Sequence, residues 1–201
     1  IINIMTPKEI RNEKLGTKLV KNLQRRNFNA FYCSNSEQAI EKVMQLMPES
    51  SSVTWGGTMT LRDMGLIQAL YDSNIYELLD RDKAPDRDAV NEIYRRTFSA
   101  DFFLSSANAI SEDGVIVNID GNGNRVAAIT FGPKNVIFVI GINKVCQDAE
   151  AALKRARSTA APTNRTINGI VHLLSRRKRM KLPMAMNRPT MSPMHMLIGI
   201  A

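Results

Sequence analysis

The chain has 201 residues, of which 44% are hydrophobic and 23% are charged, a composition that excludes disordered and fibrous proteins and fits one compact domain. Its net charge of +8 is concentrated after Pro162, where seven basic residues and no acidic residue occur, so residues 1–162 hold 20 basic and 19 acidic residues. We therefore predict an α/β domain over residues 1–162 and a basic, Met-rich tail over residues 163–201. The longest apolar run, residues 136–140, is far shorter than the roughly 20 residues that span a bilayer, so we expect no membrane association.

Helical and strand patterns alternate in units of about 25–30 residues, which is typical of parallel strands joined by right-handed crossovers. Apolar residues at helical spacing predict helices over residues 6–26, 34–47, 60–70, 86–98 and 148–159. Short apolar runs predict strands over residues 30–33, 52–55, 75–79, 102–104, 115–117 and 135–140. Capping boxes at Thr6 and Ser34, and a third cap formed by Thr60 with Asp63, indicate the first three helix starts. We expect an α/β fold with a mostly parallel sheet and helices on both faces.

A first Gly-rich turn, Trp55-Gly-Gly-Thr-Met-Thr, follows the strand predicted over residues 52–55. Ligands of open α/β sheets bind at the carboxyl ends of strands, and a helix start there offers free N–H groups and a favourable dipole to an anion. We predict ligand-binding roles for Gly56, Gly57, Thr58 and Thr60. The alternative is an ordinary helix cap on a tight turn. The turn lacks the Gly-Lys-Ser/Thr ending of an ATP-binding P-loop.

A second Gly-rich turn, Asp120-Gly-Asn-Gly-Asn-Arg, also follows a predicted strand and leads into a short helical run. It lacks the third glycine and the downstream acid of a dinucleotide-binding fingerprint. Its amides, its side chains and the guanidinium of Arg125 are suited to a carboxylate or a phosphate. The predicted ligand-binding residues here are Asn118, Gly121, Gly123, Asn124 and Arg125. The alternative is a hairpin-type turn in which Asn and Gly only accommodate positive φ.

The polar residues before the second turn are candidates for acid–base chemistry. Asn108 is a predicted ligand-binding residue, and Glu112, with Asp113, lies in the same loop. A carboxylate beside an anion site could transfer protons, so we predict Glu112 and Asp120 as the catalytic groups if the protein is an enzyme. The alternative for Glu112 is a solvent-exposed turn.

Other classes of site have little support in the sequence. Neither His172 nor His195 has metal-ligand companions at the usual spacing, so we predict no metal site and no bound cofactor. Cys33 and Cys146 are far apart and match reduced thiols in a cytoplasmic protein. The basic cluster at residues 176–181 has no aromatic residue near it to stack on bases, so we do not expect nucleic acid as the partner.

Several segments, taken together and in order, resemble the LUD-domain family of lactate-utilisation proteins, in its smaller type, over residues 8–162. The segments are Trp55-Gly-Gly-Thr-Met-Thr-Leu, Asp80-Arg-Asp, Ser106-Ala-Asn-Ala-Ile-Ser-Glu-Asp-Gly, Val117-Asn-Ile-Asp-Gly-Asn-Gly-Asn-Arg-Val-Ala, Phe131-Gly-Pro and Val139-Ile-Gly-Ile-Asn-Lys. The resemblance implies a fold like those of ribose-phosphate isomerases and CoA transferases. It also implies a link to lactate oxidation with an iron–sulfur protein as partner. Relatives of this type continue with a cysteine-rich segment, whereas this chain has no cysteine after Cys146.

Two functional hypotheses follow. The first is a cytoplasmic accessory or ligand-binding protein of bacterial lactate utilisation, whose two Gly-rich turns form one site for a small carboxylate or phosphorylated ligand. The second is an isomerase or an acyl- or CoA-type transferase that uses Glu112 or Asp120 as the acid–base group.

Overall fold

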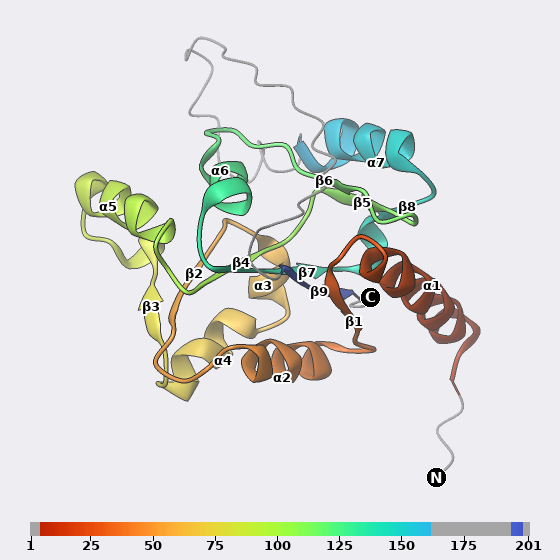
Figure 1. Cartoon of the computed structure of the whole chain (residues 1–201), viewed down its shortest axis with the longest axis horizontal. Coiled ribbons are helices and arrows are strands. Elements are labelled where there is room, and N and C mark those ends of the chain that lie inside the picture. The colour runs from red at the N-terminus through yellow and green to blue at the C-terminus, as the bar shows by residue number, and fades with distance from the viewer. Residues whose placement is uncertain (1–4, 162–193, 199–201) are drawn as a thin grey trace.

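A six-stranded sheet forms the centre of the computed structural model, which describes residues 5–161 and 194–198 (Figure 1). The strand order is β1-β9-β7-β4-β2-β3, and every neighbouring pair is parallel. The strands are β1 (Asn29–Tyr32), β2 (Ser52–Trp55), β3 (Glu77–Leu79), β4 (Phe102–Ser105), β7 (Asn135–Ile140) and β9 (Met194–Ile198). The predicted α/β fold with a parallel sheet is confirmed.

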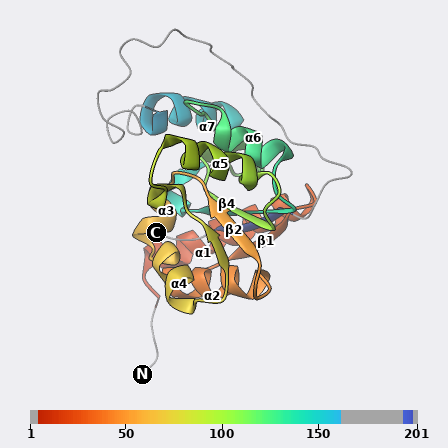
Figure 2. The ribbon, with the colours of Figure 1, turned by 90° about the vertical axis from the view of Figure 1, so that its left-hand side faces the viewer.

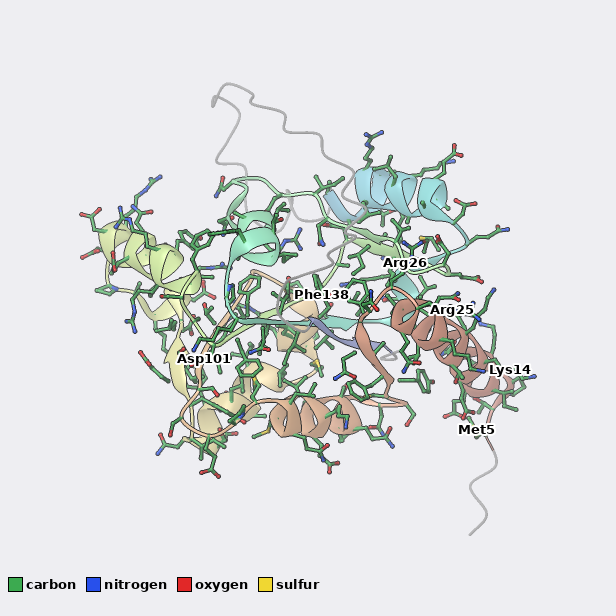
Figure 3. All side chains as sticks on the ribbon, in the orientation of Figure 1. Met5, Lys14, Arg25, Arg26, Asp101 and Phe138 are labelled. Atoms are coloured by element: carbon green, nitrogen blue, oxygen red, sulfur yellow. The ribbon has the colours of Figure 1, made fainter. Side chains whose placement is uncertain are left out.

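Helices cover both faces of this sheet, as Figures 1 and 2 show from two directions. One face packs against α2 (Ser36–Leu46), α3 (Met59–Asp63) and α4 (Leu66–Ser73), and the other against α1 (Pro7–Gln24) and α6 (Asn124–Phe131). Alternate residues of each strand enter opposite layers, because side chains point to opposite faces with a period of two. Ile137 thus packs with α2 to α4, whereas Phe138, at the centre of Figure 3, packs with α1 and α6.

Local signals explain where several helices begin. The capping box predicted at the start of α1 is present: the Thr6 N–H donates to Glu9 Oε2 at 2.6 Å, and the Glu9 N–H donates to Thr6 Oγ1 at 3.3 Å. The helix α5 (Arg87–Thr97), which packs beside β3, is capped by Asp86, whose carboxylate accepts the Ala89 N–H at 2.8 Å.

Two predicted helix starts differ from the structure. The cap of α2 is Asn35 and not Ser34; Asn35 Oδ1 accepts the Gln38 N–H at 2.9 Å. The helix predicted over residues 60–70 is two helices, α3 and α4, because Gly65 adopts φ +84° between them and ends the first. Thr60 lies inside α3, so its hydroxyl is free for a tertiary contact.

A second, three-stranded sheet lies on the side of the main sheet that α1 and α6 cover (Figure 1). It consists of β5 (Ala109–Ser111), β6 (Ile116–Val117) and β8 (Val145–Cys146), and it is covered by α7 (Ala149–Arg155) and the π-helical turn Ala156–Ala160. The strand predicted over residues 115–117 belongs here, antiparallel to β5, and not to the main sheet. The second Gly-rich turn therefore follows a strand of the small sheet.

The strand β9 lies between β1 and β7, although residues 194–198 were predicted to belong to the tail. The predicted boundary at residue 162, the basic cluster at residues 176–181 and His172 lie outside the described residues. Within residues 5–161 and 194–198, none of the helices combines the length and the apolar character that crossing a bilayer requires.

Candidate functional site

The carboxyl ends of four adjacent strands, β7, β4, β2 and β3, meet at one edge of the main sheet. Each strand continues there into a loop with polar residues. The loops are residues 141–144 after β7, 106–108 after β4, 56–58 after β2 and 80–82 after β3. Most residues of β7, β4 and β2 are buried, and their hydrogen-bonded pairing places these loops next to one another, as in the binding sites of open α/β sheets.

The two Gly-rich turns are brought together at this edge. A Cβ atom at Gly56 would lie 3.2 Å from Cδ of Arg125, and one at Gly57 would lie 2.7 Å from Nη2 of Arg81. Neither glycine has a positive φ. These positions therefore need glycine because it has no side chain, and not because of its backbone conformation. The missing side chains leave room for two arginines beside the turn. The helix start at Thr58 has no side-chain cap, so no hydroxyl of its own occupies its first N–H groups.

Arg125 is fixed by contacts to the loop after β4 and to the second turn. Its Nη2 donates to Asn108 Oδ1 at 2.9 Å and to the carbonyl of Ile119 at 3.0 Å, and its Nε lies 3.6 Å from Asp120 Oδ1. Its side chain is 11% exposed, and this burial lowers the pKa of the guanidinium, which stays charged. Asp120 also accepts the Val126 N–H at 2.8 Å, so it caps α6 while it faces Arg125.

Lys144 is a site residue that the sequence analysis did not nominate. Its Nζ donates to Thr60 Oγ1 at 2.7 Å and to Ser106 Oγ at 2.8 Å, which joins the end of β7 to α3 and to the end of β4. Burial, and then the neighbouring charges of Arg155 and Arg125, lower the pKa of Lys144 to about 8. No carboxylate forms an ion pair with it in the part of the chain that the structure describes.

Four basic side chains form what we call the cationic cluster: Arg81, Arg125, Lys144 and Arg155. The first three contact the first Gly-rich turn, and Arg155 donates to the carbonyl of Asn108 and lies close enough to act on Lys144. The nearby acids are Asp120, Asp80, Asp82 and Asp63, and Asp82 also pairs with Arg62. Lys144 and Arg155 form no ion pair among the described residues, so an anion at this half-buried edge would be attracted to them more strongly than in water.

A small pocket opens beside the cationic cluster. The residues that line it come from β2, β4, α5 and α6 and from the loop after β3: Thr54, Trp55, Arg81, Ile93, Tyr94, Thr97, Phe98, Phe103, Asn124, Arg125 and Ala128. Arg81 stacks on the ring of Tyr94, with 5.7 Å from Cζ to the ring centroid. The pocket has a volume of about 30 Å³, its lining is mostly apolar, and the guanidinium groups of Arg81 and Arg125 form part of it.

Glu112, which was predicted to be a catalytic residue, lies away from the other predicted site residues. Glu112 follows the far end of β5 from Asn108, a span of about 13 Å along an extended chain. Its carboxylate pairs with Lys18 of α1 at 2.6 Å, and Asp113 pairs with Arg26 at 3.0 Å. The loop therefore fastens α1 to the small sheet, which is a structural role.

The glycines of the second turn are also peripheral. Gly121 and Gly123 are exposed, and no heavy atom lies within 4 Å of a Cβ built on either one. Gly123 has φ +82° and begins α6, which explains the residue type without a ligand. The side-chain oxygen of Asn118 is buried and has no hydrogen-bond partner within the described ranges.

The described residues contain no cluster suited to a metal ion. Among residues 5–161 and 194–198, the side chains of His, Cys, Asp and Glu form no group of three or more that could hold one. The residues missed by sequence reasoning, Lys144 and Arg81, lie four and two residues after the ends of β7 and β3. A basic residue at the carboxyl end of a buried strand was the signal that could have identified them.

Comparisons with known proteins agree with this architecture. A family model described as the LUD domain matches residues 16–179. The crystal structure of a DUF162-family protein from Deinococcus radiodurans superimposes with a TM-score of 0.54 over 94% of this chain and 98% of that chain, at 10% sequence identity. At that identity the likeness concerns the fold alone. No curated protein matches the chain.

Proposed function

Because the chain belongs to the LUD-domain family, we propose that it is an accessory, ligand-binding protein of lactate utilisation that binds a small carboxylate or phosphorylated ligand. Membership of this family supports a role associated with lactate utilisation. The ligand class and the binding residues are inferred from the site itself.

The observation that carries the proposal is the approach of Arg125 to Gly56 and of Arg81 to Gly57, where neither glycine has a side chain in the way. Two guanidinium groups, and a lysine without a carboxylate partner among the described residues, favour a negative charge in this part of the molecule. A bound carboxylate or phosphate would supply the counter-charge that Lys144 lacks among the described residues.

The chain contains a single tryptophan, Trp55, which lies immediately before the first Gly-rich turn and lines the pocket. Its fluorescence therefore offers a direct titration signal. We expect saturable changes with at least one of lactate, pyruvate, CoA and ribose 5-phosphate, and calorimetry would give the same dissociation constant. If none of these anions binds, the proposal is wrong.

Variants locate the binding site. Arg81→Gln should weaken binding by about ten- to a hundredfold, because one charge-assisted hydrogen bond contributes about 1.5–3 kcal/mol. Arg95→Gln is the matched control, since Arg95 is 74% exposed on α5 and pairs only with Glu92 of the same helix. If Arg81→Gln and Arg95→Gln bind the anion with equal affinity, Arg81 is not part of the binding site.

The proposal also includes an iron–sulfur protein of lactate oxidation as the partner, a part that derives from the family resemblance. Co-purification of the full chain with such a protein from cells grown on lactate is the test. If the chain forms no complex with the iron–sulfur protein at micromolar concentrations, this part of the proposal is wrong. The proposed ligand site does not depend on that result.

A further inference from the structure

The surroundings of Lys144 are unusual for a half-buried lysine. Its Nζ is held by two neutral hydroxyl groups, those of Thr60 at 2.7 Å and Ser106 at 2.8 Å, with no ion-pair partner in the described ranges. Buried lysines normally pair with a carboxylate, because an ammonium group loses much hydration energy on burial. Ser106 is itself only 1% exposed, so the amine is fixed in position by rigid neighbours.

The charged groups around Lys144 oppose its protonation. Arg125, from α6, and Arg155, from α7, both add positive charge, and the one acid that acts on it is Asp63 of α3. With a pKa of about 8, the neutral amine is roughly two orders of magnitude more abundant at neutral pH than it is for an ordinary lysine. A desolvated lysine next to other cations is the usual arrangement of an amine nucleophile.

Lys144 is a neighbour of the anion site and does not line the pocket beside it. Its partner Thr60 lies three residues after Gly57, and Arg125, which approaches Gly56, is close enough to act on Lys144 electrostatically. A reaction at the amine therefore requires that a ligand held by Arg125 extends toward it.

We propose that Lys144 is a nucleophile that forms an imine with a small anion bearing a carbonyl group, either a 2-oxo carboxylate or a sugar phosphate. The inference rests on the proposed function, because the cationic cluster holds the anionic group while the amine reacts with the carbonyl.

The reaction is balanced and needs no further reagent. The nitrogen lone pair of Lys144 forms a bond to the carbonyl carbon, and the π electrons of the carbonyl move to its oxygen. A proton passes from nitrogen to that oxygen, and the hydroxyl of Ser106 or Thr60 lies within hydrogen-bond distance of Nζ to transfer it. The resulting carbinolamine loses water as nitrogen forms the C=N bond.

Reduction of the imine makes it detectable. The full chain is incubated with pyruvate in one arm and with ribose 5-phosphate in the other, each with and without sodium borohydride, and is then analysed by intact mass and peptide mapping. We expect one reduced adduct per chain, on Lys144, in at least one arm, and the reactive arm identifies the ligand class. The yield should rise as pH approaches 8, the pKa of Lys144, and not only near the ordinary lysine value of 10.5.

Two variants provide controls. Lys144→Arg keeps the positive charge and cannot form an imine, so it should lose the adduct completely, and circular dichroism checks that this variant is folded. Lys134→Arg should keep the adduct, because Lys134 is 73% exposed and bound to Asp101 at the opposite, amino ends of the strands.

The outcomes separate the two proposals. An adduct that persists in Lys144→Arg, or that is spread over exposed lysines, would overturn the imine. The same conclusion follows if the wild type binds anions and neither arm gives an adduct. Absence of both binding and adduct would overturn the proposed function as well.

Discussion

Lys144 should leave a signature in the pH dependence of stability. Its pKa is about 8 in the folded protein and 10.5 ordinarily, so between these values the unfolded chain binds more protons than the folded one. The contribution of Lys144 to the free energy of unfolding should therefore rise from pH 8 to pH 10.5, and below pH 8 the full cost of the buried charge remains. The variant Lys144→Met lacks this contribution.

Urea denaturation of both proteins at several pH values from 7 to 10 measures the effect. The stability of the wild type relative to Lys144→Met should increase by about 1–3 kcal/mol over that range. Because the other groups titrate in both proteins, their contributions cancel in the difference. If the two plots of unfolding free energy against pH are parallel, the pKa of Lys144 is not lowered in the folded protein.

Gly57 and Arg81 should act as one unit in ligand binding. A Cβ at Gly57 would lie 2.7 Å from Nη2 of Arg81, which is the end of a flexible side chain and can move away. Gly57→Ala should therefore displace the guanidinium and weaken anion binding, with a change in stability of less than about 1 kcal/mol. Arg81→Gln should weaken binding to a similar degree, and the double variant should be no weaker than either one. Additive losses would contradict this coupling.

Asp101 connects the amino ends of three strands and is labelled beside β3 in Figure 3. At the start of β4, its carboxylate accepts the Ser52 N–H of β2 at 3.0 Å, the Ser52 hydroxyl at 2.8 Å and Lys134 Nζ, just before β7, at 2.7 Å. The hydrogen bond from Lys134, followed by those from Ser52, lowers the pKa of Asp101 to about 2. The stabilisation is therefore present above the ordinary value of 3.8 and is lost as pH falls toward 2.

The variant Asp101→Asn should lower the free energy of unfolding by about 1–2 kcal/mol at pH 7, a value reduced by the partial exposure of the pair with Lys134. The difference from the wild type should narrow between pH 4 and pH 2. Chemical denaturation at both ends of that range measures it, and Asp72→Asn on α4, which contacts only Gln68 of the same helix, is the control. If Asp101→Asn loses the same amount of stability at pH 7 and at pH 2, the Asp101 carboxylate does not stabilise the fold through its lowered pKa.

The main sheet depends on a strand from near the end of the chain. In the strand order β1-β9-β7-β4-β2-β3, β1 joins the rest of the sheet only through β9. A chain that ends after residue 193 should therefore lose its cooperative thermal transition, because β1 and β7 would each lose a row of backbone hydrogen bonds in the core. A chain that ends after residue 198 keeps β9 and is the control. Circular dichroism during heating distinguishes the two, and identical melting would contradict the prediction.

Sequence reasoning was most accurate where the signal and its effect lie within a few residues. The start of α1 follows from Thr6 and Glu9, and the burial of β7 follows from its continuous apolar run. It was less accurate where two local signals compete: Gly65 ended the helix that apolar spacing extended across residues 60–70. The strand β9 was missed because the composition of its flanking segment is basic and Met-rich, which concealed a short strand pattern.

Local patterns were sufficient to predict an α/β fold, most helices and strands, and two turns suited to anions, since each of these depends on neighbouring residues. Only the tertiary structure could decide which polar groups share one space. Lys144 and Thr60 are 84 positions apart and meet because β7, β4 and β2 are adjacent and parallel. Glu112 was separated from the candidate site because the pairing of β5 with β8 directs it toward α1. Contacts of this kind depend on strand order and burial, which no short stretch of sequence encodes.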